Sequence, residues 1–444
     1  MNARPLVGVV SPMGQAQREY LLRSLAGEFD VWAFDDQRRN WVDRHVVGQS
    51  TVDPYDEEQL TRAAGAAGVD ALISWDELSA YATARAARTL GLPGPAPEAV
   101  RVCRDKYLTR RALSEYGMSM PASVPVSDID QALAAASRTG YPAVLKPRAL
   151  AGSVGPMLVR SPGELVRVFP DVLGARLPGV RVDLAEPLVL ETYLDGPEIS
   201  VDSVCFDGVV HPLFVARKEL GSPPFFEETG HWVEAGDALL HDEQLLSRLR
   251  DVHAGVGFDQ GWTHTEWRLT RNGPELVEIN SRLGGDLIPQ LGGLATGLRP
   301  AVIVAEVALG RRPDLTARGL GAAAVRFVYP DLPGELEALV VDGERLPREV
   351  VRLDPLAEPG QWLLPSAQVG GRAALVVCAG DGIPEVAKAI DESLSAITLV
   401  LRKPGGEPCH LTPMSGRLPV GATSTAPTAT STTSATSPGD NSLG

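Results

Sequence analysis

The sequence has 444 residues, 44% of them apolar, and a formal charge of −15 at neutral pH. This length suits roughly three domains of about 150 residues each, and the acidity argues against a nucleic-acid or membrane-surface binder, which usually carries a basic stripe. No apolar run approaches the roughly 18 residues needed to cross a bilayer, and positions 1–10 hold too short an apolar stretch for a signal peptide. Because the four cysteines form no CxxC pair, we expect a soluble, cytoplasmic protein.

The first hundred residues predict a parallel, doubly wound sheet. Apolar strand-like runs alternate there with helix-like stretches, with the strands at 6–10, 31–36 and 71–75 and the helices at 15–27, 56–68 and 81–94. This alternation is typical of strand–helix–strand units, whose strands run parallel. The dinucleotide fingerprint GxGxxG is absent from the first turn, so no dinucleotide site is indicated.

The middle of the chain predicts two further α/β blocks. The expected elements are a helix at 97–116, a helix at 128–139, strands at 141–147 and 157–160, a helix from Ser161, and a strand at 189–194 that opens a stretch reaching about 310. The block 320–403 contains an apolar run at 372–380 and one long helix at 383–401. Residues 404–444 are rich in Ser, Thr, Ala and Pro and cannot bury enough apolar surface to offset the entropy of ordering, so we expect a disordered tail.

The segment LVEINSRLGGD (276–286) places polar residues in a strand that otherwise reads as buried. Glu278 and Asn280 share one face because side chains alternate along a strand. A preceding strand, THTEWRLT (263–270), is joined to it by the turn signal Asn272-Gly273. A two-residue loop would place Glu266 and Glu278 on opposite faces, whereas a three-residue loop ending at Pro274 would pair Glu266 with Asn280 and Arg268 with Glu278. Only an odd-length loop would therefore gather the polar groups.

Two carboxylates and an amide oxygen on one face are hard oxygen ligands of the kind that Mg²⁺ prefers beside nucleotide phosphates. Arg282 would add a fixed positive charge next to the same centre, suited to phosphoryl oxygens or a developing oxyanion. The glycines Gly284 and Gly285 permit close approach of the backbone to a ligand. The alternative is an exposed hairpin face with a surface ion pair between Arg268 and Glu278.

A second signal is LKPRALAGSVGP (145–156). Lys146 ends a strand, and Gly152, Ser153 and Gly155 follow it in a small-residue loop. Such a loop can turn its backbone N–H groups onto phosphate oxygens while the lysine adds charge. The sequence is not a Walker A motif, and an ordinary glycine-rich connection is the alternative.

Two weaker signals surround these segments. In LETYLDGPEIS (190–200), an edge strand with Glu191, Leu194 and Glu198 could hold a purine and its ribose, although for this motif alone a strand followed by an ordinary Asp-Gly turn is the better explanation. Lys106 in DKYLTRRAL (105–113) is a lysine at the start of a helix, and alone it indicates nothing.

The order of these motifs resembles the ATP-grasp superfamily. The matching segments are DKYLTRRAL, YPAVLKPRALAGSVG, ETYLDGPEIS, and HTEW followed by VEINSRLGG. The resemblance covers about 1–403. It implies an α/β ATP-grasp fold with a doubly wound, Rossmann-like domain at 1–104, a two-lobed ATP-binding domain at 105–310 with a mobile lid at about 121–190, and a small C-terminal α/β domain at 311–403.

The resemblance also implies a role for each motif residue. Lys106, Lys146, Gly152, Ser153, Gly155, Glu191, Tyr193, Leu194 and Glu198 would bind ATP, and Glu266, Glu278 and Asn280 would bind Mg²⁺, with Mn²⁺ as an alternative ion. Arg282 would be the catalytic residue that stabilises an acyl phosphate and a tetrahedral intermediate.

Within the superfamily, PPFFEETGHWVEAG (223–236) and RFVYPDLPG (326–334) are similar to the L-amino-acid ligase, dipeptide-forming branch. Glu228, His231, Gly284 and Gly285 are then substrate-binding candidates, although His231 could equally be a structural histidine.

The activity implied is ligation of a carboxylic acid to an amine through an acyl phosphate, with release of ADP and phosphate. The partners implied are small-molecule acids and amines, with no nucleic acid and no membrane, and related enzymes often form homodimers. The alternatives are a carboxylase of the biotin or purine type and a non-catalytic nucleotide-binding module.

Overall fold

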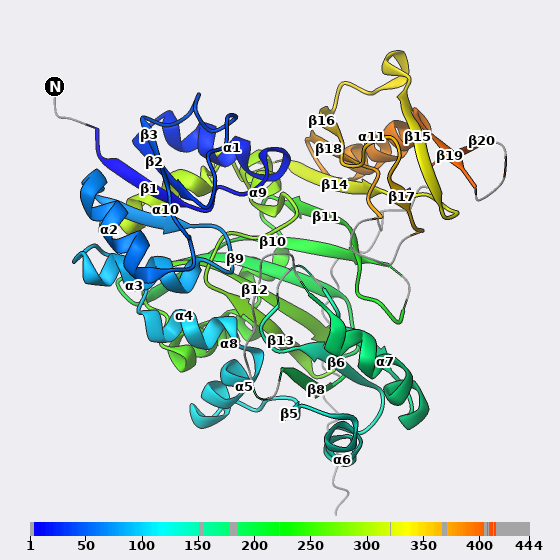
Figure 1. Cartoon of the computed structure of the whole chain (residues 1–444), viewed down its shortest axis with the longest axis horizontal. Helices are drawn as coiled ribbons and strands as arrows, with labels where there is room; N and C mark the ends of the chain where they lie inside the picture. The colour runs from blue at the N-terminus through cyan, green and yellow to red at the C-terminus, as the bar shows by residue number, and fades with distance from the viewer. Residues whose placement is uncertain are drawn as a thin grey trace, which may run out of the picture.

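The computed structural model describes most of the chain (Figure 1). The described residues are 4–150, 152, 154–176, 185, 187–221, 223–319, 321–365, 371–403, 406, 408–411 and 413. Ser153 and most of the predicted tail lie outside them.

The N-terminal unit is a parallel four-stranded sheet with the order β3-β2-β1-β4, which confirms the predicted parallel sheet. Its elements are β1 (Leu6–Val10), α1 (Gln15–Ala26), β2 (Asp30–Asp35), β3 (Gly48–Thr51), α2 (Glu57–Ala67), β4 (Ala71–Ser74) and α3 (Ala80–Thr89). The short strand β3 was not expected, because GQST is polar and does not alternate.

The single helix expected at 97–116 is wrong, because Asp105 divides it into α4 (Pro97–Arg104) and α5 (Lys106–Glu115). The Asp105 carboxylate accepts hydrogen bonds from the backbone N–H groups of Tyr107 (3.0 Å) and Leu108 (3.1 Å). Arg148 Nε also donates to it at 2.7 Å. A capped, extended Asp105 thus starts a new helix at Lys106.

A second, smaller unit follows, with an antiparallel sheet of order β5-β8-β6-β7 covered by two helices. Its elements are β5 (Ser123–Val126), α6 (Ile129–Thr139), β6 (Ala143–Pro147), β7 (Met157–Val159), α7 (Pro162–Gly174) and β8 (Leu188–Thr192). Since β8 lies between β5 and β6, the edge strand expected around Glu191 is wrong. This unit projects from one end of the molecule (Figure 1).

The central sheet is antiparallel, with the order β13-β12-β9-β10-β11-β14-β18-β16. Its strands are β9 (Glu198–Phe206), β10 (Val209–Leu220), β11 (Glu228–Glu234), β12 (Gly261–Thr270), β13 (Gly273–Asn280), β14 (Ala322–Val328), β16 (Val350–Pro355) and β18 (Ala374–Gly380). The pairing of β11 with β14 carries this sheet across position 310. The domain boundary placed there stays a prediction.

Helices pack on both faces of the central sheet. The short helix η1 (Ala238–His241) and α8 (Glu243–Val256) precede β12, and α9 (Ile288–Thr296) and α10 (Pro300–Ala308) follow β13. Within the described residues no single helix is long and apolar enough to cross a membrane, and only the pair α9 and α10, bent by 101°, would pass by length and composition. Side chains of this pair, such as Leu291 and Ile303, lie in the largest core cluster.

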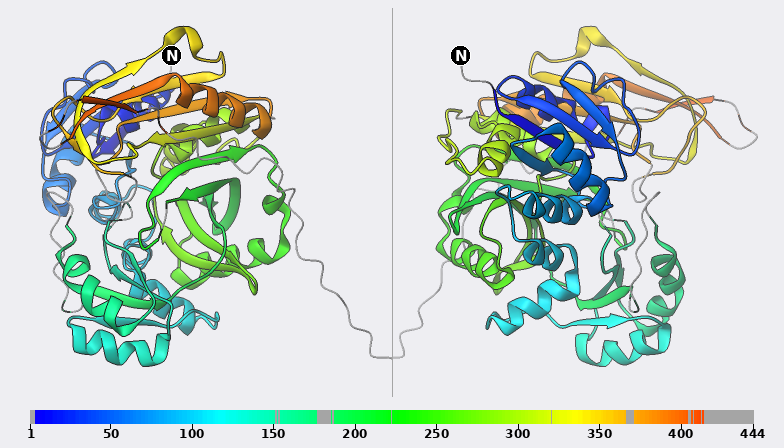
Figure 2. Two further views of the ribbon diagram at one scale, coloured as in Figure 1. Left: turned by 90° about the vertical axis from the view of Figure 1, so that its right-hand side faces the viewer. Right: turned by 60° about the vertical axis from the view of Figure 1, so that its left-hand side comes forward.

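The C-terminal unit stacks a sheet of order β17-β15-β19-β20 next to α11, above the central sheet in Figure 2. Its elements are β15 (Gly334–Val341), η2 (Gly343–Arg345), β17 (Trp362–Leu363), α11 (Ile383–Ser395), β19 (Ile397–Arg402) and β20 (Pro408–Leu411).

Two expectations are wrong here. The helix predicted to reach 401 ends at Ser395, because Ile397, Leu399 and Leu401 alternate inward at the period of a strand. Residues 408–411 form β20 against β19, so this part of the predicted tail is ordered.

Candidate functional site

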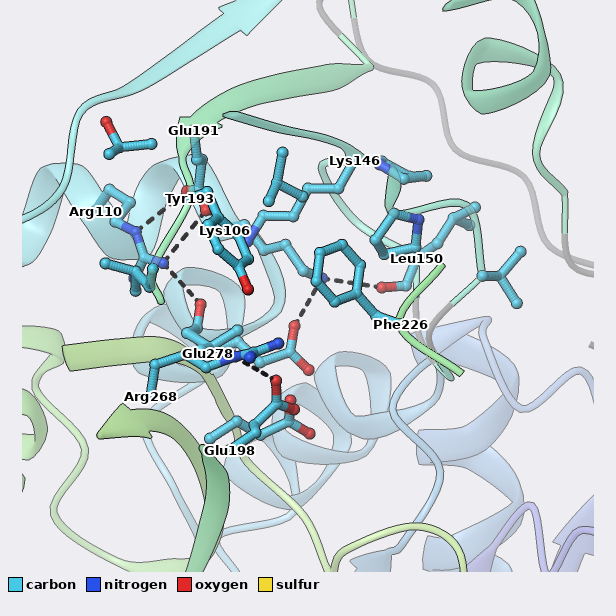
Figure 3. Close-up of a pocket in the computed structure, with 18 of the residues that line it drawn as sticks. Lys106, Arg110, Lys146, Leu150, Glu191, Tyr193, Glu198, Phe226, Arg268 and Glu278 are labelled. Carbon is cyan, nitrogen blue, oxygen red and sulfur yellow. Dashed lines mark hydrogen bonds and ion pairs between the residues drawn. The ribbon is translucent and has the colours of Figure 1, made fainter. Parts of the chain in front are cut away.

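The main cleft lies between the small sheet β5–β8 and the central sheet (Figure 3). Nine of the predicted site residues line it, namely Lys106, Lys146, Gly152, Glu191, Tyr193, Leu194, Glu198, Glu266 and Glu278. These residues are spread over 173 positions, from 106 to 278, and come from both sheets and from α5. The fold therefore brings together motifs that the sequence could only place in order.

The hairpin β12–β13 has a different register from the one expected. Thr270 pairs with Gly273, which leaves a two-residue loop, and Glu266 pairs with Glu278 instead of Asn280. A bulge at Val277 shifts the register between Trp267 and Glu266. The odd-length loop and the Arg268–Glu278 pairing were therefore wrong. Nevertheless Glu266, Glu278 and Asn280 do share one face, because the bulge supplies the extra residue.

Two buried cations neutralise Glu266. Lys218 Nζ on β10 lies 2.8 Å from Glu266 Oε1, and His264 Nε2 lies 3.3 Å from the same oxygen. Burial alone would raise the pKa of Glu266, but Lys218 and His264 outweigh it and hold that pKa well below its usual value. Asp202 accepts from His264 Nδ1 at 2.9 Å. Burial disfavours the imidazolium, but Asp202 prevails and raises the pKa of His264 to about 9. Glu266 is therefore ionised beside two positive charges.

Glu278 is held by the helix that starts at Lys106. Lys106 Nζ lies 2.9 Å from Glu278 Oε2 and donates to the backbone oxygen of Leu150 at 3.1 Å (Figure 3). Burial opposes ionisation of Glu278, but Lys106 more than compensates and lowers the pKa of this carboxyl. Asn280 Nδ2 donates to Glu278 Oε1 at 3.1 Å. Lys106 thus links the hairpin to the loop after β6.

Glu191 is tied to two cations of the cleft. Lys146 Nζ lies 2.5 Å from its Oε2 and Arg110 Nε lies 3.1 Å from its Oε1. Burial would raise the pKa of Glu191, but Arg110 and Lys146 lower it to about 2. In turn, burial lowers the pKa of Lys146 despite this partner. Glu191 therefore holds Lys146 and Arg110 in place in the lining of the main cleft.

Two aromatic side chains, Tyr193 and Phe226, line the main cleft. The rings of Tyr193 and Phe226 lie 6.4 Å apart, and the guanidinium of Arg268 lies 5.9 and 5.6 Å from their centroids. Arg268 is fixed by Glu198, with Nε 2.8 Å from Oε2. These aromatic faces in the lining of the cleft suit contact with a flat heterocycle.

The loop after β6 approaches the cleft closely. Gly152 lines it, and Gly155 has a φ of +91° with a hypothetical Cβ only 2.9 Å from Pro147 Cγ, so a side chain would be strained there and would clash. Gly155 is not among the residues that line the cleft. Ser153 lies outside the described residues, so its predicted role stays untested.

A second cavity of about 190 Å³ adjoins the main cleft, and Gly152, Glu266 and Glu278 line both. Its remaining lining residues are Glu227, Glu228, His264, Arg282, Gly285, Asp286, Ile288 and Arg372. The two carboxylates predicted to bind metal therefore stand between the two spaces.

Arg282 enters the second cavity from the end of β13. Its Nε lies 3.0 Å from Glu77 Oε2, and its NH1 and NH2 groups donate to the Leu283 carbonyl (2.8 Å) and to Asn280 Oδ1 (3.5 Å). Gly284 packs against His264, because a Cβ there would lie 2.9 Å from His264 Nδ1. These contacts fix Arg282 beside the carboxylate pair.

Of the substrate candidates, Glu228 lines this cavity, and His231 lies behind it in contact with Glu228. Glu228 contacts Lys218 Nζ at 2.8 Å, and His231 Nε2 lies 3.1 Å from Glu228 Oε2 and 3.5 Å from Asp286 Oδ2. His231 is fully buried and is not among the lining residues. It braces two carboxylates that line the cavity.

The residues on this face fit Mg²⁺ by their chemistry. Glu266 and Glu278 are ionised, directly opposed across the hairpin, and joined on the same face by the amide of Asn280. Carboxylate and amide oxygens are ligands that Mg²⁺ prefers. Another group of carboxylates, on Glu198, Glu228 and Glu266, is also close enough to share an ion. Lys218, with a fully buried side chain, already contacts all three of those carboxylates.

Sequence reasoning missed several charged residues of the site. Lys218 on β10 and Asp202 on β9 are charged side chains buried in strands that are also rich in apolar residues, and this composition was a usable signal. Arg110 lay within a motif already singled out. Arg372 gave no signal, because its partner Asp286 is 86 positions away.

The chain is similar to several known proteins. Residues 139–290 match the family model described as an ATP-grasp domain. Human carnosine synthase 1 is 30% identical over 390 residues, covering 80% of this chain and 46% of the relative. Alanine–anticapsin ligase from Bacillus subtilis is 28% identical over 308 residues, covering 64% of this chain and 61% of the relative.

Among solved structures, the L-amino acid ligase from Bacillus licheniformis matches with a TM-score of 0.76 at 20% identity, over 91% of this chain and all of that one (100%). The chain spans about half the length of the first curated relatives that it matches, 54% and 46%. The matched domain includes the loop after β6, the strand β8 and the hairpin that carries Glu266 and Glu278. The chain has the ATP-grasp fold, and its residues 139–290 match the ATP-grasp domain.

Proposed function

We propose that the protein is an ATP-dependent carboxylate–amine ligase that forms an amide bond and releases ADP and phosphate. The observation that carries this proposal is the position of Glu266 and Glu278, which line both the main cleft and the second cavity. If these carboxylates hold Mg²⁺ and the ion in turn binds the phosphate chain, the chain would lie next to the second cavity, where a carboxylic acid could bind. The similarity to ligases named for amide products supports the same reading.

The main cleft is proposed to bind ATP. The adenine is proposed to lie against the rings of Tyr193 and Phe226, with Leu194 beside it and Glu198 towards the ribose. Lys106 and Lys146 face the phosphates, and Gly152, Ser153 and Gly155 belong to the loop that covers them. ATP-grasp domains bind ATP with Mg²⁺. Glu266, Glu278 and Asn280 would hold that ion, which when bound neutralises phosphate charge.

The chemistry proposed has two steps. A carboxylate oxygen of the acid attacks the γ-phosphorus, the bond to the bridging oxygen breaks, and ADP leaves with an acyl phosphate remaining. A neutral amine then attacks the acyl carbon, and phosphate leaves as the nitrogen loses a proton. Arg282 lies beside the carboxylate pair and would stabilise the negative oxygens in both steps. Most of the rate comes from positioning and charge neutralisation.

The small unit β5–β8 is proposed as the lid. Its loop reaches the hairpin through the Lys106 contact with Leu150, and its strands form one wall of the cleft. An acyl phosphate hydrolyses if water reaches it, so a closed wall favours transfer to the amine.

The test is a phosphate-release screen of acid and amine pairs with ATP and Mg²⁺, followed by mass analysis of the products. We expect ADP and phosphate to form only when both substrates are present. Formation of AMP, or phosphate release that requires bicarbonate without any amine, would refute the ligase. Arg282→Ala should lower turnover by roughly 10²–10³-fold, while Arg299→Ala, at a half-exposed surface arginine, should leave it unchanged.

Three finer features belong to the same proposal. Mn²⁺ should replace Mg²⁺ at the carboxylate pair, which a metal titration of ADP release checks. A homodimer is checked by light scattering, and a cytoplasmic location by fractionation of cells that express the chain.

A further inference from the structure

His264 lies on β12, two residues before the carboxylate of Glu266 that is proposed to hold metal. Along β12, Trp262, His264 and Glu266 point to the same face of the sheet, because side chains alternate along a strand. On the neighbouring strand β9, Asp202 lies directly opposite His264. The pairing of the two strands therefore places an acid, an imidazole and a second acid next to one another.

Asp202 holds the imidazole ring in one orientation. Its side chain is fully buried, and it accepts hydrogen bonds from Trp262 Nε1 and from His264 Nδ1, both at 2.9 Å. A buried carboxylate without such partners would be costly. Because Nδ1 is bonded to Asp202, the other ring nitrogen, Nε2, is the one next to Glu266, at 3.3 Å from Oε1.

Gly284 confines the same ring. It belongs to the segment that carries Arg282, and a Cβ at this position would lie 2.9 Å from His264 Nδ1 and 3.1 Å from Cε1. A side chain there would have to displace the ring. Asp202 and the backbone of Gly284 together fix the place of Nε2.

The contacts of Glu266 are concentrated on one of its two oxygens. Lys218 Nζ lies 2.8 Å from Oε1, and His264 Nε2 approaches the same Oε1. The Glu266 side chain also lines both the main cleft and the second cavity. With Oε1 engaged by two cations, Oε2 is the oxygen left to meet a ligand in these spaces.

Another buried histidine, His253 on α8, shows the contrast. Its Nδ1 lies 2.7 Å from the Leu249 carbonyl oxygen, and its Nε2 lies 2.8 Å from Thr263 Oγ1. Leu249 and Thr263 are not among the described residues that line the main cleft or the second cavity. His253 therefore connects a helix to the sheet, whereas His264 connects Asp202 to a carboxylate of the site.

We propose that His264 is a positioning residue for Glu266. Held by Asp202, it contacts Oε1 and so directs Oε2 of Glu266 towards the Mg²⁺ that accompanies the nucleotide. This inference rests on the proposed function, because it assumes that Glu266 binds that ion. Partners behind a metal ligand fix its orientation, and replacing such a partner typically weakens metal binding by about 10–100-fold.

The test compares the affinity of the full chain for ADP with and without Mn²⁺, by isothermal titration calorimetry. The ratio of the two affinities measures what the ion contributes. In His264→Asn the short amide can still reach Asp202, in the place of Nδ1, but not Glu266. In His264→Gln the longer amide can reach Glu266, in the place of Nε2. We expect His264→Asn to lower the ratio about tenfold without changing ADP affinity in the absence of Mn²⁺, and His264→Gln to keep the ratio within a few-fold of the wild type.

Two further variants control for stability. Each His264 variant loses one of the two ring contacts, so urea unfolding should show a similar loss of stability in both. His253→Asn should also lose stability, but its Mn²⁺ ratio should equal that of the wild type. Gly284→Ala should displace the ring without altering its nitrogens, so it should lower the ratio as well, and it decides the question if the His264 variants do not fold.

An unchanged ratio in His264→Asn, or equal losses in His264→Asn and His264→Gln, would overturn the inference, because the ratio would then not depend on contact with Glu266. An unchanged ratio in Gly284→Ala would overturn it where the His264 variants do not fold. A wild type whose ADP affinity does not respond to Mn²⁺ would overturn both the inference and the proposed metal site. A ratio that depends on His264 as expected, without amide formation from any pair of substrates, would support the inference and count against the ligase.

Discussion

Replacing Lys218 by methionine removes a buried charge from the centre of the site while keeping a long apolar side chain. The side chain of Lys218 is fully buried, and its Nζ contacts three carboxylates. Each of these carboxylates keeps one other cation. The retained pairs are Glu198 with Arg268, Glu228 with His231, and Glu266 with His264.

The expected loss of stability follows from this geometry. Removing one partner of a buried ion pair typically costs about 3–5 kcal/mol. The three carboxylates of the Lys218 cluster retain partners, so we place the loss at the lower end, about 3 kcal/mol at pH 8. Urea unfolding followed by tryptophan fluorescence measures it. Lys388→Met on α11, which removes a largely exposed lysine, should leave the unfolding midpoint unchanged.

In Lys218→Met, the contribution of Glu266 to stability should depend on pH in the opposite direction from the wild type. In the wild type the folded pKa of Glu266 lies below its unfolded value, so this group stabilises the protein above about pH 4.5, and the contribution is lost as the pH falls through the folded pKa. Without Lys218, burial dominates and should raise the folded pKa. Stability would then be present at low pH and lost as the pH rises, by up to about 1.4 kcal/mol per pH unit for each such group.

Wild type and variant should therefore converge between pH 8 and pH 5. A constant difference between their unfolding midpoints over that range would refute the reasoning, because it would show that the carboxylates do not titrate against the buried lysine.

Three further predictions concern the reaction. Arg282→Ala should lower kcat by roughly 10²–10³ with little change in KM for ATP, and a kcat within a few-fold of wild type in an ADP-release assay would contradict its role. Glu278→Gln should raise the Mg²⁺ concentration for half-maximal activity by about tenfold or more, and an unchanged Mg²⁺ titration would argue against metal binding there. Arg372→Lys should raise KM for the substrate of the second cavity as much as Arg372→Met does, because lysine cannot make the two-pronged contact with Asp286. Full rescue by lysine would show that charge alone is needed.

In the hairpin β12–β13, the sequence predicted which side chains share a face but not the register of the two strands. Alternation along a strand correctly placed Glu278 and Asn280 on one face, since that depends only on local geometry. The partner strand depended on register, and the bulge at Val277 is not encoded by any turn signal. The prediction that Glu266 shares this face was correct, although the loop length from which it was derived was wrong. The alternation of side chains along β13 therefore predicted the face of Glu278 and Asn280 better than the turn sequence predicted the register.

Errors elsewhere have a similar origin. The helix at 97–116 was broken by Asp105, whose cap is reinforced by Arg148 from 43 residues away. The helix at 383–401 ended early, because β19 finds strand partners on both sides that the local pattern could not reveal. Local propensity predicted the type of most elements, and tertiary contacts decided their ends.

The segment 276–286 has ion-pair partners from three other parts of the fold. Glu278 is paired with Lys106 from α5, Arg282 with Glu77 from the N-terminal unit, and Asp286 with Arg372 from the C-terminal unit. Each polar group would be costly to bury alone, and each is offset only when another unit packs against it. The charges of Glu278, Arg282 and Asp286 are therefore compensated only when the other parts of the chain have folded against this segment. The same packing sets Arg282 beside the carboxylate pair, so the contacts that stabilise the fold also position the groups proposed to react.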